Sequence, residues 1–338
     1  MSALRPLASY ALVLAALAGL VLAALCVGRF PVGVADVFHA LVGALLGTPP
    51  DLPANVQTVV LQVRTPRVAA ALLVGAALAG AGSAYQSMFR NPLVSPDILG
   101  VSSGAALGAV AGIFLSQSVI AIQGFAFAGG LIAVAAVYLI GSALRGYDNT
   151  LTLILTGVVI GTLLGSGIAL IKYLADPYNQ LPAITFWLLG SLASVAPADV
   201  KVVAPLALLG MLPLWLLRWR INLLSLPDDE ARSLGINVTA LRTVVIVAAT
   251  LMTAASVAVS GIIGWIGLLV PHMARMLVGP DFARLLPMAL LIGAGYLLGV
   301  DTLARTMAQI EVPPGVLTAL IGTPFFVWLL AVARRGWT

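Results

Sequence analysis

The chain has 338 residues, of which 61% are hydrophobic and 9% are charged, and its formal net charge is +5. Because an ordinary soluble domain has roughly 25% charged residues, this composition excludes a soluble globular protein. The single cysteine, Cys26, excludes a disulfide within the chain and a cysteine-based metal site. Apolar runs of about twenty residues, long enough to cross a bilayer, recur along the chain. The sequence therefore predicts an all-α, polytopic membrane protein with one transmembrane domain over residues 1–338.

The hydropathy pattern predicts about ten membrane spans. The first apolar run, 8–28, exceeds the 7–15 residues of a signal-peptide core, so we interpret it as a span. The later spans are expected at 66–88, 98–116, 121–144, 151–174, 198–217, 239–260, a short run ending near His272 and Arg275, 284–306 and 315–333.

The segments between the predicted spans divide into two external segments and one cytoplasmic segment. Residues 29–61 and 175–195 are expected outside, the first with a short amphipathic helix around 34–46, and residues 218–238 are expected in the cytoplasm. With ten spans, eleven of the seventeen Lys and Arg residues fall on the cytoplasmic side. This excess predicts that both termini are cytoplasmic.

Glycines recur along two of the predicted spans. A spacing of four places residues on one helix face, where small side chains let a neighbouring backbone approach closely in a membrane. We therefore predict that two glycine sets form helix-packing faces: Gly100, Gly104, Gly108 and Gly112 in the third span, and Gly157, Gly161 and Gly165 in the fifth.

The most polar stretch of the chain lies between the sixth and seventh spans. Pro227 is followed by Asp228, Asp229 and Glu230, and acidic residues are stabilised at the positive N-terminal end of a helix. Gly235 is a plausible helix stop. The pattern predicts a short cytoplasmic helix, and the alternative is an ordinary solvated loop.

The charged residues argue against catalysis in this chain. The only two lysines, Lys172 and Lys201, lie in no phosphate-binding loop, and the two histidines are isolated in sequence. Asp301 is the only acid well inside a predicted span. Arg305 follows it at i+4, so we expect an ion pair between them, and the alternative is the ion relay of a secondary carrier.

Motifs along nearly the whole chain resemble those of one transporter family. In chain order they are Arg64-Thr-Pro-Arg67, Arg90-Asn-Pro-Leu93, Asp97-Ile-Leu-Gly-Val-Ser-Ser-Gly104, Phe186-Trp-Leu-Leu-Gly-Ser191, Glu230-Ala-Arg-Ser-Leu-Gly235, Gly264-Trp-Ile-Gly-Leu-Leu-Val-Pro-His272 and Gly322-Thr-Pro-Phe325. Together they resemble the permease subunits of binding-protein-dependent ABC importers for iron-siderophores, haem and cobalamin.

The resemblance implies a role for three groups of residues. It implies that an external substrate-binding protein docks on Arg64, Arg67 and Arg305. It implies that the cytoplasmic gate is formed by Asn91, Leu93 and Thr150. It implies that the ATPase is coupled through a helix containing Asp229, Glu230, Ala231, Arg232, Leu234 and Gly235.

The resemblance also implies the partners and excludes a cofactor in this chain. It predicts a type II importer in a bacterial cytoplasmic membrane, built from two copies of this subunit, two ATPase subunits that bind ATP and Mg, and the external binding protein. The expected substrate is a ferric siderophore first and haem second, and then cobalamin or an oxyanion such as molybdate. An ion-coupled secondary transporter is the alternative of another class. Contact with lipid is expected, whereas a metal site and a nucleic acid partner are not expected.

Overall fold

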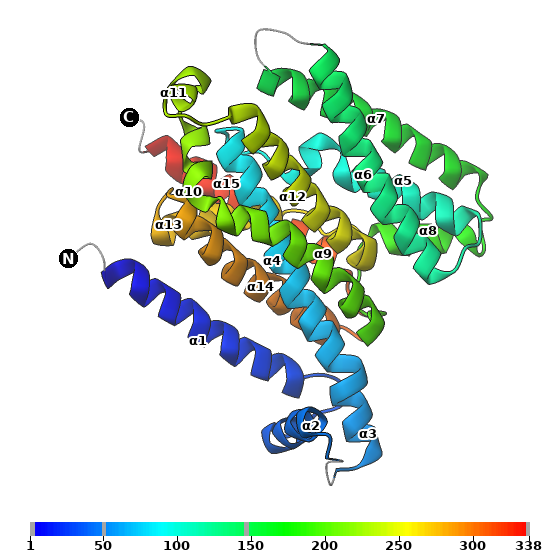
Figure 1. The fold of residues 1–338 in the computed structure, drawn as a ribbon. Helices are drawn as coiled ribbons and strands as arrows, with labels where there is room; N and C mark the ends of the chain where they lie inside the picture. Colours follow the sequence, from blue (N-terminus) through cyan, green and yellow to red (C-terminus); the bar gives the residue numbers. More distant parts are fainter. Residues whose placement is uncertain (1–3, 49–51, 145–148, 336–338) are drawn as a thin grey trace.

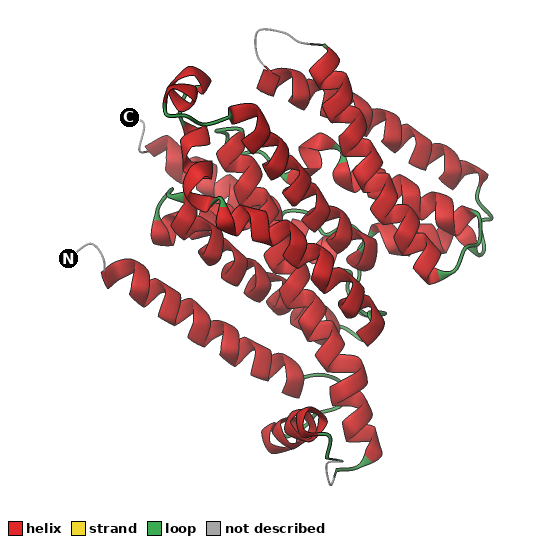
Figure 2. Ribbon diagram, in the orientation of Figure 1, coloured by secondary structure: helices red, strands yellow, loops and turns green. Residues whose placement is uncertain are grey.

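The computed structural model describes residues 4–48, 52–144 and 149–335, and within these ranges all regular structure is helical (Figure 2). The α-helices are α1 (Leu4–Cys26), α2 (Val34–Leu46), α3 (Ala54–Gln57), α4 (Thr65–Met88), α5 (Val101–Phe114), α6 (Val119–Ala143), α7 (Asn149–Leu174), α8 (Gln180–Leu188), α9 (Pro197–Leu216), α10 (Arg218–Ile221), α11 (Asp228–Ser233), α12 (Val238–Ser260), α13 (Ile266–Val278), α14 (Phe282–Thr306) and α15 (Pro314–Arg335). Three other helical turns connect them: the π-helix η1 (Thr58–Arg64) and the 3-10 helices η2 (Pro96–Leu99) and η3 (Asn222–Ser225).

Seven helical segments in the described chain are long and apolar enough to cross a membrane. They are α1, the continuous helix from α3 to α4, α6, α7, α9, α12 and α14. The shorter apolar helices α5, α13 and α15 lie where the third, eighth and tenth spans were predicted. The all-helical membrane fold is therefore confirmed, whereas the number of ten spans stays a prediction.

Helix α4 is at the centre of the molecule, and most of its residues are buried (Figure 1). It packs against α14 and α12, which are also largely buried, while α1 and α7 are mostly exposed. On one side of this central group, α5, α6, α7 and α8 form a second group, joined to it through contacts of α6 and α5 with α12 (Figure 1). The arrangement leaves the apolar outer faces of α1 and α7 for lipid or for other chains.

The helix that ends in α4 begins earlier than expected, at Ala54, within the predicted external segment 29–61. The π-helical turn η1 ends at Arg64, two residues before Pro66, whose ring nitrogen has no hydrogen to donate. In η1 the backbone N–H of Thr65 bonds the carbonyl of Val60, and the Thr65 hydroxyl donates to the same oxygen at 2.7 Å. This wider turn accommodates the proline without ending the helix.

Glycines allow the closest helix contacts, as the glycine face of α5 illustrates. A methyl group at Gly104 or Gly108 would overlap the backbone carbonyls of Gly129 or Phe125, both in α6, and one at Gly112 would lie 3.2 Å from Ile122. Gly157 of α7 similarly abuts the carbonyl of Ile98.

The other predicted packing glycines differ from the expectation. Gly100 has a φ of 77° and begins α5, so its role is backbone freedom at a helix start. A methyl group at Gly161 would approach only the Ser103 hydroxyl, at 3.9 Å, and one at Gly165 would meet nothing within 4 Å. Gly161 therefore faces α5 loosely, opposite Ser103, whereas Gly165 has no such neighbour within this chain, and close packing at these two positions stays a prediction.

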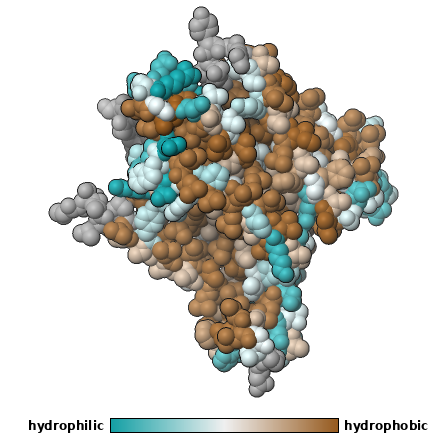
Figure 3. Space-filling model, viewed as in Figure 1, coloured by the Kyte–Doolittle hydropathy of each residue, from teal (hydrophilic) through white to brown (hydrophobic). Residues whose placement is uncertain are grey.

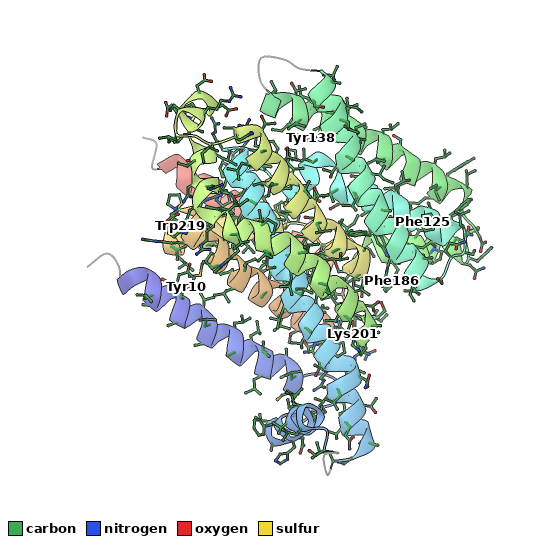
Figure 4. All side chains as sticks on the ribbon, viewed as in Figure 1. Tyr10, Phe125, Tyr138, Phe186, Lys201 and Trp219 are labelled. Atoms are coloured by element: carbon green, nitrogen blue, oxygen red, sulfur yellow. The ribbon has the colours of Figure 1, made fainter. Side chains whose placement is uncertain are left out.

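Polar residues gather at the ends of the helix group, and a broad hydrophobic surface separates them (Figure 3). One polar end has α11 and α10, and both the start of α1 and the end of α15 lie on that side (Figure 1). Trp219 on α10 lies toward this end, whereas Lys201 near the start of α9 lies toward the other (Figure 4). We refer to them as the α11 end and the α2 end.

Candidate functional sites

Arg64 lies at the α2 end, where η1 meets α4, and its side chain is buried. Its guanidinium donates hydrogen bonds to the carbonyls of Leu25 at 2.6 Å and Cys26 at 3.0 Å, and also to the carbonyl of Phe30. The last carbonyls of a helix have no partner within the helix. Arg64 therefore caps the C-terminal end of α1, a position where positive charge is favourable.

Arg305 of α14 is also buried and donates to the carbonyl of Ala24, in the last turn of α1. The predicted ion pair between Asp301 and Arg305 is wrong. Asp301 accepts instead from Arg67, at 2.9 Å from Nη2 and 3.0 Å from Nε. The two helices α4 and α14 are in close contact, so an arginine on the neighbouring helix reaches Asp301 in a better geometry than the one at i+4.

Arg67 also binds Glu311, in the segment between α14 and α15, through Nη1 at 3.1 Å and Nη2 at 2.9 Å. The hydrogen bond and charge of Arg67 hold the pKa of Glu311 below its usual value. Sequence reasoning missed Glu311, because it lies 244 residues from Arg67 and no local pattern connects them.

The structure thus brings Arg64, Arg67 and Arg305 together at the α2 end, and all three have acceptors within the chain. A carboxylate of the binding protein would have to share these arginines with their present acceptors or displace those acceptors. Docking by these residues stays a prediction.

Two of the three predicted gate residues, Asn91 and Leu93, lie in the turn that follows α4, at the α11 end. Arg90 ends the helix with a φ of 51°, in the left-handed region that a residue with a side chain seldom adopts. The Asn91 side chain accepts from the backbone N–H of Leu93 at 2.9 Å, and Leu93 is exposed. Thr150 lies in the first turn of α7, but its side chain lies outside the described residues.

His272 connects this turn to α13. Its Nε2 lies 3.1 Å from the carbonyl oxygen of Pro92. His272 and Pro271 are inside α13, which continues past Arg275 to Val278. The missing N–H of Pro271 leaves the carbonyl of Gly267 without its helical partner, and the Gln86 side chain donates to that carbonyl at 3.4 Å instead.

Helix α11 coincides with the predicted cytoplasmic helix. It begins after Pro227, and Gly235 stands beyond its end with a φ of 81°, which favours glycine. Leu234 is exposed, whereas Ala231 is buried and faces the protein. Ala231 is therefore unsuited to direct contact with a partner, and Leu234 remains suited to it.

Asp228, in the first turn of α11, forms the densest charge contact at this end. It accepts from Arg242 of α12 at 2.8 Å through both oxygens and from Arg90 at 2.7 Å. Sequence reasoning missed this group. The acid was noted only for its position at a helix start, and its partners lie 138 and 14 residues away.

The Asp228 contacts predict that the stability of α11 depends on pH. Burial alone would raise the pKa of Asp228, but the hydrogen bonds and charges of Arg242 and Arg90 outweigh it and lower that pKa. The stabilisation is therefore present above the unfolded pKa of about 4 and is lost as the pH falls through the lower folded value. Protonation should loosen α11 by about 1 kcal/mol, the upper value for an exposed pair.

Amide hydrogen exchange across α11, corrected for intrinsic rates, would measure this loosening between pH 7 and pH 3. Asp228→Asn keeps the neighbouring acids Asp229 and Glu230, so it is the control and should respond less to pH than the natural chain. An equal response of both proteins would contradict the assignment to Asp228.

A largely apolar cleft of about 680 Å³ lies between α8, the segment before α13, and α15. Its lining includes Leu189, Trp265, Val316 and Thr323. Among the described residues, no group of three or more His, Cys, Asp or Glu side chains is arranged to hold a metal ion. The cleft can therefore offer apolar and weakly polar contact.

Similar proteins cover nearly the whole chain. A protein of Helicobacter pylori assigned as an iron chelatin transport system permease is 44% identical over 281 residues, covering 83% of this chain and 85% of the relative. The molybdate import system permease of Haemophilus influenzae is 39% identical, covering 92% and 91%.

A solved inward-facing structure of a protein assigned as a metal-chelate type ABC transporter superposes with a TM-score of 0.87. It is 37% identical to this chain, with 96% of this chain and 99% of the other covered. The model of the FecCD transport family matches residues 14–332. The chain is a member of the FecCD transport family and has the fold of an ABC-importer permease.

Proposed function

We propose that the chain is the permease subunit of a type II, binding-protein-dependent ABC importer that moves a metal chelate across the cytoplasmic membrane of a bacterium. Two copies would form the pathway, each as a single domain of ten spans with both termini in the cytoplasm. ATP and Mg would be bound by two separate ATPase subunits, so this chain itself is not an enzyme. The preferred substrate is a ferric siderophore and then haem, and the alternatives are cobalamin and an oxyanion such as molybdate.

The observation that supports this proposal best is the position of α11. It is a short helix at a polar end of the hydrophobic bundle, with Asp229 and Leu234 exposed toward any partner. Its first acid is bound to arginines at the ends of α4 and α12. A subunit that binds α11 can therefore act on two central helices at once.

The chemistry of Asp301 argues against the ion-coupled carrier. Such a carrier needs an ionisable group that can gain and lose its ion or proton in the membrane. Asp301 is 1% exposed and is held by two nitrogens of Arg67. An acid fixed in this way is suited to packing α14 against α4.

The proposal predicts that this chain copurifies with an ATPase subunit and that a loaded binding protein accelerates ATP hydrolysis. The experiment is reconstitution in liposomes and titration with the binding protein carrying ferric siderophore, haem or cobalamin in turn. Acceleration by one loaded form would identify the substrate. Uptake that follows an ion gradient, with no ATPase subunit bound, would overturn the proposal.

A further inference from the structure

The carboxylate of Asp228 joins three separate elements. Arg90 belongs to the turn that follows α4, Asp228 to α11 and Arg242 to α12. The side chain of Arg242 is 16% exposed, that of Asp228 31% and that of Arg90 37%. The group is therefore partly shielded from water, where charge-assisted hydrogen bonds are stronger than at a free surface.

Arg90 connects this group directly to the turn of residues 90–93. It has a second contact on the same side, because its Nε donates to the carbonyl of Leu224 in η3 at 2.9 Å. Its backbone is also constrained, since the N–H of Asn91 bonds the carbonyl of Gln86 and closes the end of α4. A displacement of Asp228 must therefore move Arg90, which directly precedes Asn91.

A second connection fixes the segment before α11. The Asn222 side chain donates to Asp281 at 2.6 Å and accepts from the backbone N–H of Phe282 at 2.7 Å, at the start of α14. Leu224 is buried. The segment from η3 to α11 is thus attached at both ends, so that it moves with the helices instead of independently of them.

The other ion pairs described at this end differ from the Asp228 group. Arg232 and Asp229 are 3.6 Å apart, and Arg284 and Asp281 are 3.7 Å apart. Each pair joins residues three apart along one helix end, and both arginine side chains are 58% exposed. Pairs of this kind contribute little and connect no separate elements. Arg284 therefore provides a matched control.

We propose that Asp228 is the positioning residue that links α11 to the turn of residues 90–93, with Arg90 as its contact to the turn and Arg242 as its support on α12. A push on α11 is then transmitted to Asn91 and Leu93 through hydrogen-bonded side chains. The inference rests on the proposed function for the origin of that push, which is the ATPase subunit. The link itself depends only on this chain.

The first test measures transport per ATP hydrolysed in liposomes that contain the complex and its binding protein. Asp228→Asn and Arg90→Gln should each lower this ratio about tenfold, equal to about 1.4 kcal/mol of coupling free energy. The double variant should be no worse than either single variant, because both remove the same link. Asp228→Glu should recover part of the ratio, and Arg284→Gln should leave it unchanged.

Two results of this transport measurement would contradict the inference. A ratio in Asp228→Asn equal to that of the natural protein would overturn the inference. Additive effects of Asp228→Asn and Arg90→Gln would also overturn it, because two independent losses of stability would add in the same way.

A second test needs no ATPase subunit, so a failure of the proposed function can be told apart from a failure of the link. Cys26 is replaced by Ser, and spin labels are placed at Leu93 and Leu234, which are both exposed. Asp228→Asn should broaden the distance distribution between the labels, and Arg284→Gln should not. An unchanged distribution in Asp228→Asn would disprove the link whatever the chain transports.

Discussion

Replacement of Arg67 with Met should lower the free energy of unfolding by about 3–5 kcal/mol, the effect of removing one partner of a buried ion pair. The reason is the position of Asp301, which is 1% exposed and is bound by both Nε and Nη2 of Arg67. Without Arg67 the carboxylate would keep its burial and lose these donors. The loss should appear as a lower midpoint in a thermal-stability scan of the purified protein.

Two variants test the explanation. Glu311→Gln should have a small effect, because the Glu311 side chain is 35% exposed and Arg67 would still pair with Asp301. The double variant Arg67→Met with Asp301→Leu should recover most of the lost stability, since apolar residues can replace a buried pair with little cost. If Arg67→Met and Glu311→Gln proved equally harmful, the burial of Asp301 would not be the cause.

The same double variant separates packing from docking. It removes the charge of Arg67 while keeping the protein folded. Binding-protein affinity measured on it would therefore report the docking role predicted for Arg67 alone. Exposed pairs contribute roughly 0–1 kcal/mol each, so the expected loss of affinity from one such contact is at most about fivefold.

Replacement of Gly75 with Ala should destabilise the protein by roughly 1–3 kcal/mol through overpacking. A methyl group at Gly75 would overlap the carbonyl oxygen of Gly293 and lie 2.9 Å from the Leu297 side chain. The contact is reciprocal, because a methyl group at Gly293 would overlap the Gly75 carbonyl and the side chain of Ala79. Both obstacles include backbone, so α4 and α14 would have to separate.

Gly19→Ala is the matched control for this prediction. Gly19 lies in α1, and a methyl group there meets nothing within 4 Å. Alanine is favoured over glycine inside a helix by about 1 kcal/mol, so this variant should be neutral or slightly stabilising. The measurement is the same thermal scan. A comparable loss in both variants would show that general helix effects, and not the α4–α14 contact, govern stability.

Local patterns were sufficient to predict several elements closely. The amphipathic helix expected around 34–46 is α2, between Gly33 and Gly47, and the short helix expected after Pro227 is α11. In both places the residues that start and end the helix lie directly beside it in the sequence. The physical chemistry that decides these elements acts over a few residues.

Contacts between distant helices could not be predicted in the same way. The i+4 spacing favoured Arg305 as the partner of Asp301, but the packing of α4 on α14 places Arg67 there, 234 residues away. The helix start at Ala54 was missed for a related reason. Polar residues before Pro66 indicate an exposed segment by composition alone, whereas the π-helical turn that carries the helix through them depends on backbone geometry.

The capping of α1 by Arg64 and Arg305 has a consequence for the synthesis of the protein. Arg64 is made soon after α1, but Arg305 lies 281 residues beyond Ala24, the residue whose carbonyl it binds. Helix α1 packs mainly on α14 and is otherwise largely exposed. Helix α1 therefore gains its main neighbour only after all the residues between the two helices, up to α14, have been synthesised. Until then α1 can contact lipid, Arg64 and its smaller neighbours α2, η1 and α4, so its final packing is a late step of folding.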